Sequence, residues 1–124
     1  MVENVRLNRE RTPELYDKIF SAIQTVSETL IKSIQSSDSE TMKECLRINH
    51  ELLRAINVCG DTLGKIVESA LRLNIKGKMT GGGGGGTCVF LVTDEDFEGF
   101  RQVCEDNNWE FIVASLSAQG VIIE

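Results

Sequence analysis

The feature that most constrains this chain is an uninterrupted run of six glycines, Gly81 to Gly86. Ordering one glycine costs roughly 0.5–1 kcal/mol more than ordering an alanine, so a run of this length needs a reason to be ordered. A flexible linker is one interpretation. The run contains no serine, proline or charge, and it lies between an alternating segment and an apolar one, which favours a loop between two strands. Such a loop can present backbone N–H groups to an anion.

The residues that follow the run exclude two common phosphate-binding loops. A P-loop ends in Lys and Ser or Thr and then opens a helix, whereas Thr87 and Cys88 lead into an apolar strand pattern. The dinucleotide fingerprint G-x-G-x-x-G also opens a helix, and any run of glycines matches its letters. The sequence therefore predicts a strand, a glycine loop and a second strand.

Composition and charge exclude several classes of protein. The formal charge of −6 argues against a nucleic-acid-binding protein, which is normally basic. No apolar run approaches the ~18 residues of a membrane span, and the N-terminus lacks the apolar stretch of a signal peptide. The four cysteines have no C-x-x-C spacing, so we expect reduced thiols in a cytoplasmic protein. His50, the single histidine, has no second ligand at metal spacing and is expected to be structural or at the surface.

Apolar spacing predicts three helices ahead of the glycines, because apolar residues recur at steps of three and four. Thr12 as N-cap and Pro13 at the first helical position start a helix of about 22 residues. Ser37 and Glu40, spaced as a capping box, start the next. Residues 1–11 are either a lead-in segment or the broken start of a helix. The three buried stripes are predicted to be Leu15, Ile19, Ala22, Ile23, Val26, Leu30 and Ile34; then Met42, Cys45, Leu46, Leu52, Leu53 and Ile56; then Leu63, Ile66, Val67, Ala70 and Leu73.

The second half of the chain combines two predicted helices with four segments that have strand patterns. The third helix starts at Gly60-Asp61 and stops at Asn74, and Thr93 caps a fourth helix that ends at the turn Asn107-Asn108. Four segments have strand patterns: residues 75–80, 88–92, 109–113 and 121–123, of which 88–92 is apolar on both faces like a central strand. The order of elements indicates one α+β domain in which helices cover a sheet.

The string from Lys78 to Gly86, K-M-T-G-G-G-G-G-G, resembles the third motif of the GHMP kinases. Members of the mevalonate kinase branch have K-L-T-G-A-G-G-G-G-C there, so Gly82 replaces an alanine and Thr87 the usual cysteine. Residues 49–58 resemble the family's N-H-x-L-L-x-x-L-G-V helix end, and residues 117–121 its final strand. The resemblance extends from Asn49 to the end of the chain.

The resemblance implies a fold and an activity. The fold would be that of the GHMP kinase C-terminal domain, a four-stranded antiparallel (ferredoxin-like) sheet packed by about four helices. The activity would be transfer of a phosphoryl group from ATP, with Mg²⁺, to a small mevalonate-like alcohol. The family's catalytic Asp and Lys and its nucleotide loop lie in an N-terminal half that has no counterpart here. We therefore expect this chain to be inactive alone and to have that N-terminal kinase half as its partner.

The resemblance also implies a set of site residues, with no catalytic residue and no metal ligand among them. Thr80 would touch substrate or phosphate, beside the pocket-lining glycines Gly81, Gly82, Gly83, Gly84 and Gly85. Lys78 and Asn49 would support the loop, and Asn49 lies on a predicted buried stripe where its amide needs hydrogen-bond partners. Two alternatives stay open. The chain is a stand-alone binding module with an anion-binding or disordered glycine loop, or it self-associates as a homo-oligomer.

Overall fold

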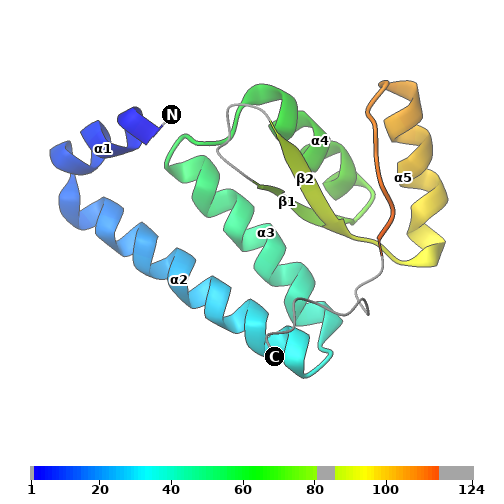
Figure 1. Ribbon diagram of the computed structural model, residues 1–124, viewed down its shortest axis with the longest axis horizontal. Coiled ribbons are helices and arrows are strands. Elements are labelled where there is room, and N and C mark those ends of the chain that lie inside the picture. Colours follow the sequence, from blue (N-terminus) through cyan, green and yellow to red (C-terminus); the bar gives the residue numbers. More distant parts are fainter. Residues whose placement is uncertain (1, 81–85, 115–124) are drawn as a thin grey trace, which may run out of the picture.

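The computed structural model describes residues 2–80 and 86–114, and within them the chain forms an α+β domain (Figure 1). The elements in chain order are α1 Val2–Arg11, α2 Pro13–Gln35, α3 Ser39–Ala55, α4 Asp61–Arg72, β1 Lys76–Thr80, β2 Thr87–Leu91 and α5 Asp94–Asp106. The predicted helices are confirmed, and residues 1–11 belong almost entirely to a helix of their own. None of the helices in the described residues is long and apolar enough to cross a membrane.

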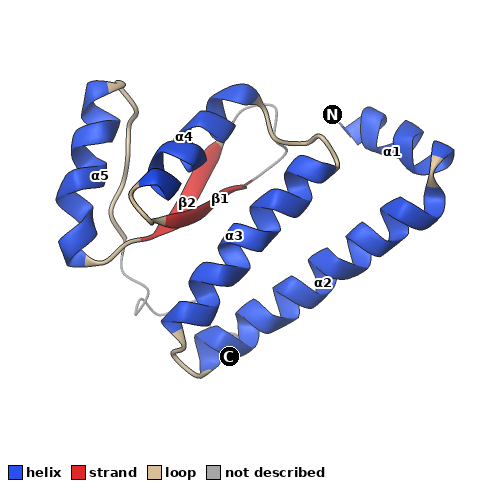
Figure 2. Cartoon of the chain, turned by 180° about the vertical axis from the view of Figure 1, so that it is seen from behind, coloured by secondary structure: helices blue, strands red, loops and turns tan. Residues whose placement is uncertain are grey.

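The helices and strands form layers that are visible from both sides of the molecule (Figure 2). α2 packs along α3, while α3 and α4 both contact the hairpin of β1 and β2. α5 lies on the far side of α4 and reaches the core through Phe100 and Cys104, which cluster with Ala70 and Ile75. The core therefore sits where α3, α4 and α5 meet the hairpin.

The ends of the helices show which of the predicted capping residues cap a helix in the structure. Thr93 caps α5 as predicted, because its hydroxyl accepts the N–H of Asp96 at 3.3 Å. Asn74 has a φ of 59°, as a left-handed stop requires. The predicted capping box is wrong: Ser37 has a φ of 55°, and the carboxylate of Asp38 accepts the Thr41 N–H at 3.1 Å instead. The chain has to leave α2 through a left-handed residue, which moves the cap one position along.

Thr12 precedes α2, as predicted, but its side chain does not cap that helix. The Thr12 hydroxyl donates to the carbonyl of Asn8 at 3.1 Å, which links it back to α1. Pro13 occupies the first turn of α2, where the missing N–H costs nothing. The start of α2 is therefore fixed by proline geometry.

The predicted buried stripes are only partly covered. Leu15 is 58% exposed and Ile34 53% exposed, while Tyr16 and Ser33 on the same helix are buried. Leu73, predicted to be buried at the end of the third stripe, is 40% exposed. Within the described residues α2 packs on α1 and α3. These two contacts bury a narrower stripe of α2 side chains than the sequence predicts.

The sheet found in the described residues is an antiparallel hairpin, with Gly77 opposite Phe90 and Met79 opposite Cys88. A Cβ on Gly77 would lie 2.1 Å from the Phe90 ring and 2.7 Å from the Val89 carbonyl oxygen, so only glycine fits there. Val89 is 45% exposed, and β2 pairs with β1 alone in the described part of the chain. A central place for β2 therefore stays a prediction.

The four-stranded sheet is therefore seen only in part. Residues 109–113, predicted as a strand, form neither helix nor strand; the chain runs beside α5 there, and Ile112 is 95% exposed. Alternation alone does not make a strand, because a strand needs a neighbour for its backbone groups. The predicted last strand, residues 121–123, lies outside the described residues.

Candidate functional site

The two ends of the glycine run are joined at the tip of the hairpin. Thr80 and Thr87 are partners in the strand register, and the Thr80 hydroxyl donates to the Thr87 carbonyl oxygen at 3.2 Å. The two hydroxyls are 2.8 Å apart and share a second hydrogen bond. Gly86 has a φ of 115°, a conformation that favours glycine. The two strands predicted on either side of the run are confirmed, while Gly81 to Gly85 lie outside the described residues.

The residue that ties this hairpin to the helices is His50. It is 3% exposed, and its Nδ1 accepts the backbone N–H of Met79 at 3.2 Å. This bond joins α3 to β1 one residue before Thr80. The expectation of a structural role for His50 is confirmed and the surface alternative is wrong. The sequence offered no sign of its partner, which is 29 residues away.

Asn49, predicted to support the loop, is half-buried on α3 beside His50. Its Oδ1 is shielded from solvent and has no hydrogen-bond donor among the described residues. A buried carbonyl without a donor costs about 1–3 kcal/mol. Its support of the loop therefore stays a prediction.

Lys78 and Cys88 bring a cation and a thiol close to the base of the loop. Burial lowers the pKa of the half-buried Lys78, and the neighbouring Cys88 opposes this shift. Burial also raises the pKa of the Cys88 thiol to about 11, with Cys59 acting in the same direction. Cys88 is therefore a protonated thiol at neutral pH and a poor nucleophile. All four cysteines are free thiols, as predicted.

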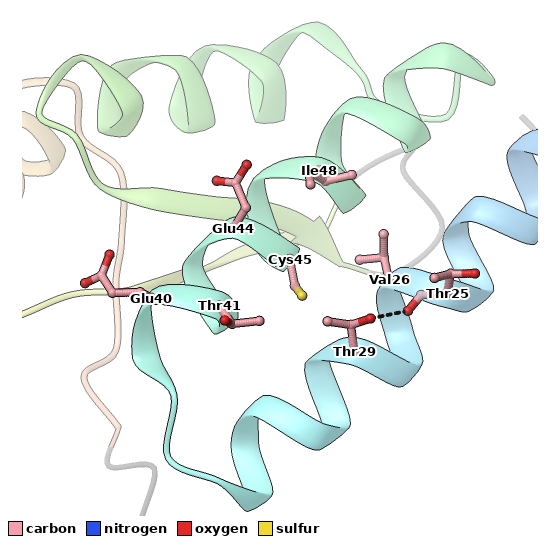
Figure 3. Close-up of a pocket in the computed structure, with 8 residues that line it drawn as sticks. All are labelled: Thr25, Val26, Thr29, Glu40, Thr41, Glu44, Cys45 and Ile48. Atoms are coloured by element: carbon pink, nitrogen blue, oxygen red, sulfur yellow. Dashed lines mark hydrogen bonds between the residues drawn. The ribbon is translucent and has the colours of Figure 1, made fainter.

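A separate groove lies between α2 and α3 (Figure 3). Its volume is about 350 Å³, and it is lined by Thr25, Val26, Thr29, Glu40, Thr41, Glu44, Cys45 and Ile48. Both charged residues in this lining are acids, which would repel a phosphate group. Among the described residues, no group of three His, Cys, Asp or Glu side chains is placed to hold a metal ion. The lining of this groove therefore does not favour an anion.

The hairpin of β1 and β2, tied to α3 through His50 and carrying Lys78 on β1, belongs to an α+β domain. Residues 30–107 match the family model described as GHMP kinases C terminal. This match covers more than half of the chain, and the chain therefore belongs to the GHMP kinase family through its C-terminal domain. The predicted family is confirmed.

The curated relatives are mevalonate kinases. The chain is 39% identical to that of Archaeoglobus fulgidus over 90 residues, which cover 73% of this chain and 30% of the relative. It is 27% identical to that of Arabidopsis thaliana over 131 residues, which cover 99% of this chain and 35% of the relative. The chain thus spans about a third of the length of these relatives.

The fold is also similar to a solved structure, that of L. major mevalonate kinase in complex with R-mevalonate. The TM-score is 0.76 at 18% sequence identity, and the match covers 85% of this chain and 33% of the other. At that identity the likeness shows the fold alone. The α+β arrangement of helices and hairpin is therefore shared with that solved structure.

Proposed function

We propose that this chain is the C-terminal domain of a mevalonate-kinase-like, ATP-dependent phosphotransferase whose glycine segment closes the active site. One observation carries the proposal. In a GHMP kinase chain, the string that resembles the third motif starts on β1 and ends directly before β2, with Thr80 and Thr87 bonded across the base. A paired base fixes where the glycines leave and re-enter the hairpin.

The chemistry of this site would be positioning and charge stabilisation rather than covalent catalysis. Phosphoryl transfer depends on donors and cations aimed at the oxygens of the moving group. Thr80 would offer its hydroxyl, Lys78 its positive charge and the glycines Gly81 to Gly85 their backbone N–H groups. Thr80 has to release the Thr87 carbonyl before it can donate to a phosphate oxygen.

Mg²⁺ does not fit a site made by residues 2–80 and 86–114 alone. The described residues hold no suitable cluster of three metal-ligating side chains. The proposal therefore assigns metal binding, the catalytic Asp and Lys and most contacts to ATP to an N-terminal half. A cytoplasmic location is part of the same proposal, since four free thiols suit a reducing compartment.

The exposed apolar side chains of α1 and α2 support a partner surface. Leu7, Leu15, Ile31 and Ile34 are each at least 46% exposed. Leu15 lies at the start of α2, whereas Ile31 and Ile34 lie in its last turns. Exposed apolar side chains are a feature of interaction surfaces. We assign this surface to the N-terminal kinase half, with a second copy of this chain as the alternative occupant.

A chimera tests the proposed function and its substrate. This chain would replace the corresponding C-terminal segment of the Archaeoglobus fulgidus mevalonate kinase, which it matches at 39% identity. We expect the chimera to phosphorylate mevalonate with ATP, since the relative supplies the N-terminal half. Phosphomevalonate and galactose serve as competing acceptors, and the same kinase without its C-terminal segment is the control.

The chimera gives a decisive outcome in either direction. Turnover of mevalonate well above the truncated control supports the proposal. A folded chimera with no turnover of any of the three acceptors contradicts it and favours a stand-alone binding module. If the chimera turns over only phosphomevalonate or galactose, the proposed phosphotransferase activity stands and the proposed mevalonate-like substrate is wrong.

A further inference from the structure

A buried hydrogen bond joins His50 on α3 to the backbone of β1. The His50 ring is 3% exposed and Met79 is 1% exposed, so the bond from the Met79 N–H to Nδ1 is shielded from water. A shielded hydrogen bond is stronger than an exposed one and costly to lose. Met79 directly precedes Thr80, so this bond sets the position of the last residue of β1.

The donor in this bond dictates the state of the ring. A backbone N–H can only donate, so Nδ1 must carry a lone pair and the neutral ring must carry its proton on Nε2. Nε2 lies 3.9 Å from the sulfur of Cys59, a weak acceptor. A second proton on the ring would sit on Nδ1 and face the Met79 N–H. Protonation therefore breaks the bond.

The groups around the ring keep it neutral. Burial is the main cause that lowers the pKa of His50 below its usual 6.5. Glu51 on the same helix opposes this shift, whereas Arg54 on α3 and Lys78 on β1 reinforce it. Cys59 lies beside Nε2, and burial raises the pKa of its thiol.

The sign of the pH effect follows from this shift. The unfolded chain takes up a proton on His50 near pH 6.5, while the folded chain takes it up only at lower pH. The contribution of His50 to stability is therefore complete above about pH 6.5 and is lost as the pH falls through the folded pKa. Physiological pH lies on the side where the bond is made.

We propose that His50 is a positioning residue that fixes Thr80 through the Met79 N–H, and that it does so only as the neutral ring with its proton on Nε2. The use of this bond in phosphoryl transfer rests on the proposed function, whereas the bond itself does not. Acid releases the end of β1 while the rest of the hairpin stays paired.

Two substitutions distinguish the effect of the hydrogen bond from the effect of the volume of the ring. In His50→Asn, the carboxamide oxygen lies near the position of Nδ1 and accepts without titrating. In His50→Leu, the apolar volume remains but the acceptor is lost. The readout is the hydrogen-exchange protection of the Met79 amide in the full chain, followed by NMR at pH 7.5 and at pH 5. The Ile75 amide, which donates to Ala70 at 2.9 Å in the core, reports global opening.

The expected result is a pH-dependent loss of hydrogen-exchange protection at the Met79 amide alone. In the wild type, acid should lower the protection of Met79 about two- to tenfold relative to Ile75, the range that one hydrogen bond of ~0.5–1.5 kcal/mol allows. His50→Asn should keep the protection at both pH values, and His50→Leu should lack it at both. Equal losses at Met79 and Ile75 would overturn the proposal, and so would a pH dependence that persists in His50→Asn.

An activity measurement keeps this proposal distinct from the proposed function. In the chimera, His50→Asn should flatten the acidic limb of kcat/KM, whereas a merely structural role would shift the whole profile. If acid does not lower the protection of the Met79 amide although the chimera is active, His50 is not a positioning residue. The NMR effect in the full chain, together with a chimera that has no turnover, rejects the phosphotransferase and leaves the bond between His50 and Met79 standing.

Discussion

Replacing Phe100 by alanine should lower the free energy of unfolding by about 3–5 kcal/mol, the usual cost of emptying a buried phenylalanine site. Phe100 is 7% exposed, and its ring meets Phe90 edge to face with the centroids 4.8 Å apart. This contact joins α5 to the hairpin, in the same cluster as Ala70 and Ile75. Urea denaturation followed by circular dichroism measures the change.

Phe111→Ala is the matched control for this core substitution. Phe111 also makes an edge-to-face pair, with Phe97 at 6.1 Å, but it is 43% exposed. Its loss should cost about 1 kcal/mol or less, since exposed positions contribute little. Equal losses for Phe100→Ala and Phe111→Ala would contradict the position of the core described here.

Replacing Thr80 by valine should lower kcat/KM of the chimera by about 10²–10³-fold, the effect of removing one donor to a transition-state oxygen. Valine keeps the shape of threonine and removes only the hydroxyl. Valine is a good strand residue, so we expect the backbone pairing of β1 with β2 to remain, although both hydrogen bonds of the Thr80 hydroxyl to Thr87 are lost. Steady-state kinetics with ATP and mevalonate measure the loss.

Thr87→Val is the control, because it removes the hydroxyl that pairs with the Thr80 hydroxyl and leaves Thr80 intact. It breaks the 2.8 Å contact between the two hydroxyls but leaves Thr80 its own hydroxyl and the Thr87 carbonyl as acceptor. We expect Thr87→Val to stay within a fewfold of the wild type. A loss as large as that of Thr80→Val would mean that the pair acts only by holding the hairpin together.

Local signals predicted the elements well because each is decided within a few residues. The N-cap at Thr93 and the left-handed stop at Asn74 depend on neighbours in sequence, and both are found. Ser37 failed for a reason that the sequence does not carry: the path out of α2 gives it a positive φ, and Asp38 takes the cap. The prediction of a strand at residues 109–113 failed because pairing depends on a neighbouring strand.

The candidate site was predictable only where it is continuous in sequence. Lys78, Thr80 and the glycines form one string, and the hairpin places both ends of that string together. His50 could not be found in this way, because its partner is the backbone N–H of Met79, which has no side-chain signature. Polarity on an apolar stripe pointed to Asn49 instead, one residue away, whose Oδ1 has no donor in the described part of the chain.

The central claim is that this chain is one part of a two-part phosphotransferase. The most direct measurement is ATP-dependent phosphorylation of mevalonate by this chain alone, by a separately expressed mevalonate kinase N-terminal half, and by the two mixed. We predict no turnover by either piece and turnover by the mixture that saturates as this chain is added. Protein-dependent turnover by this chain alone, or a mixture no more active than the N-terminal half, would contradict the account.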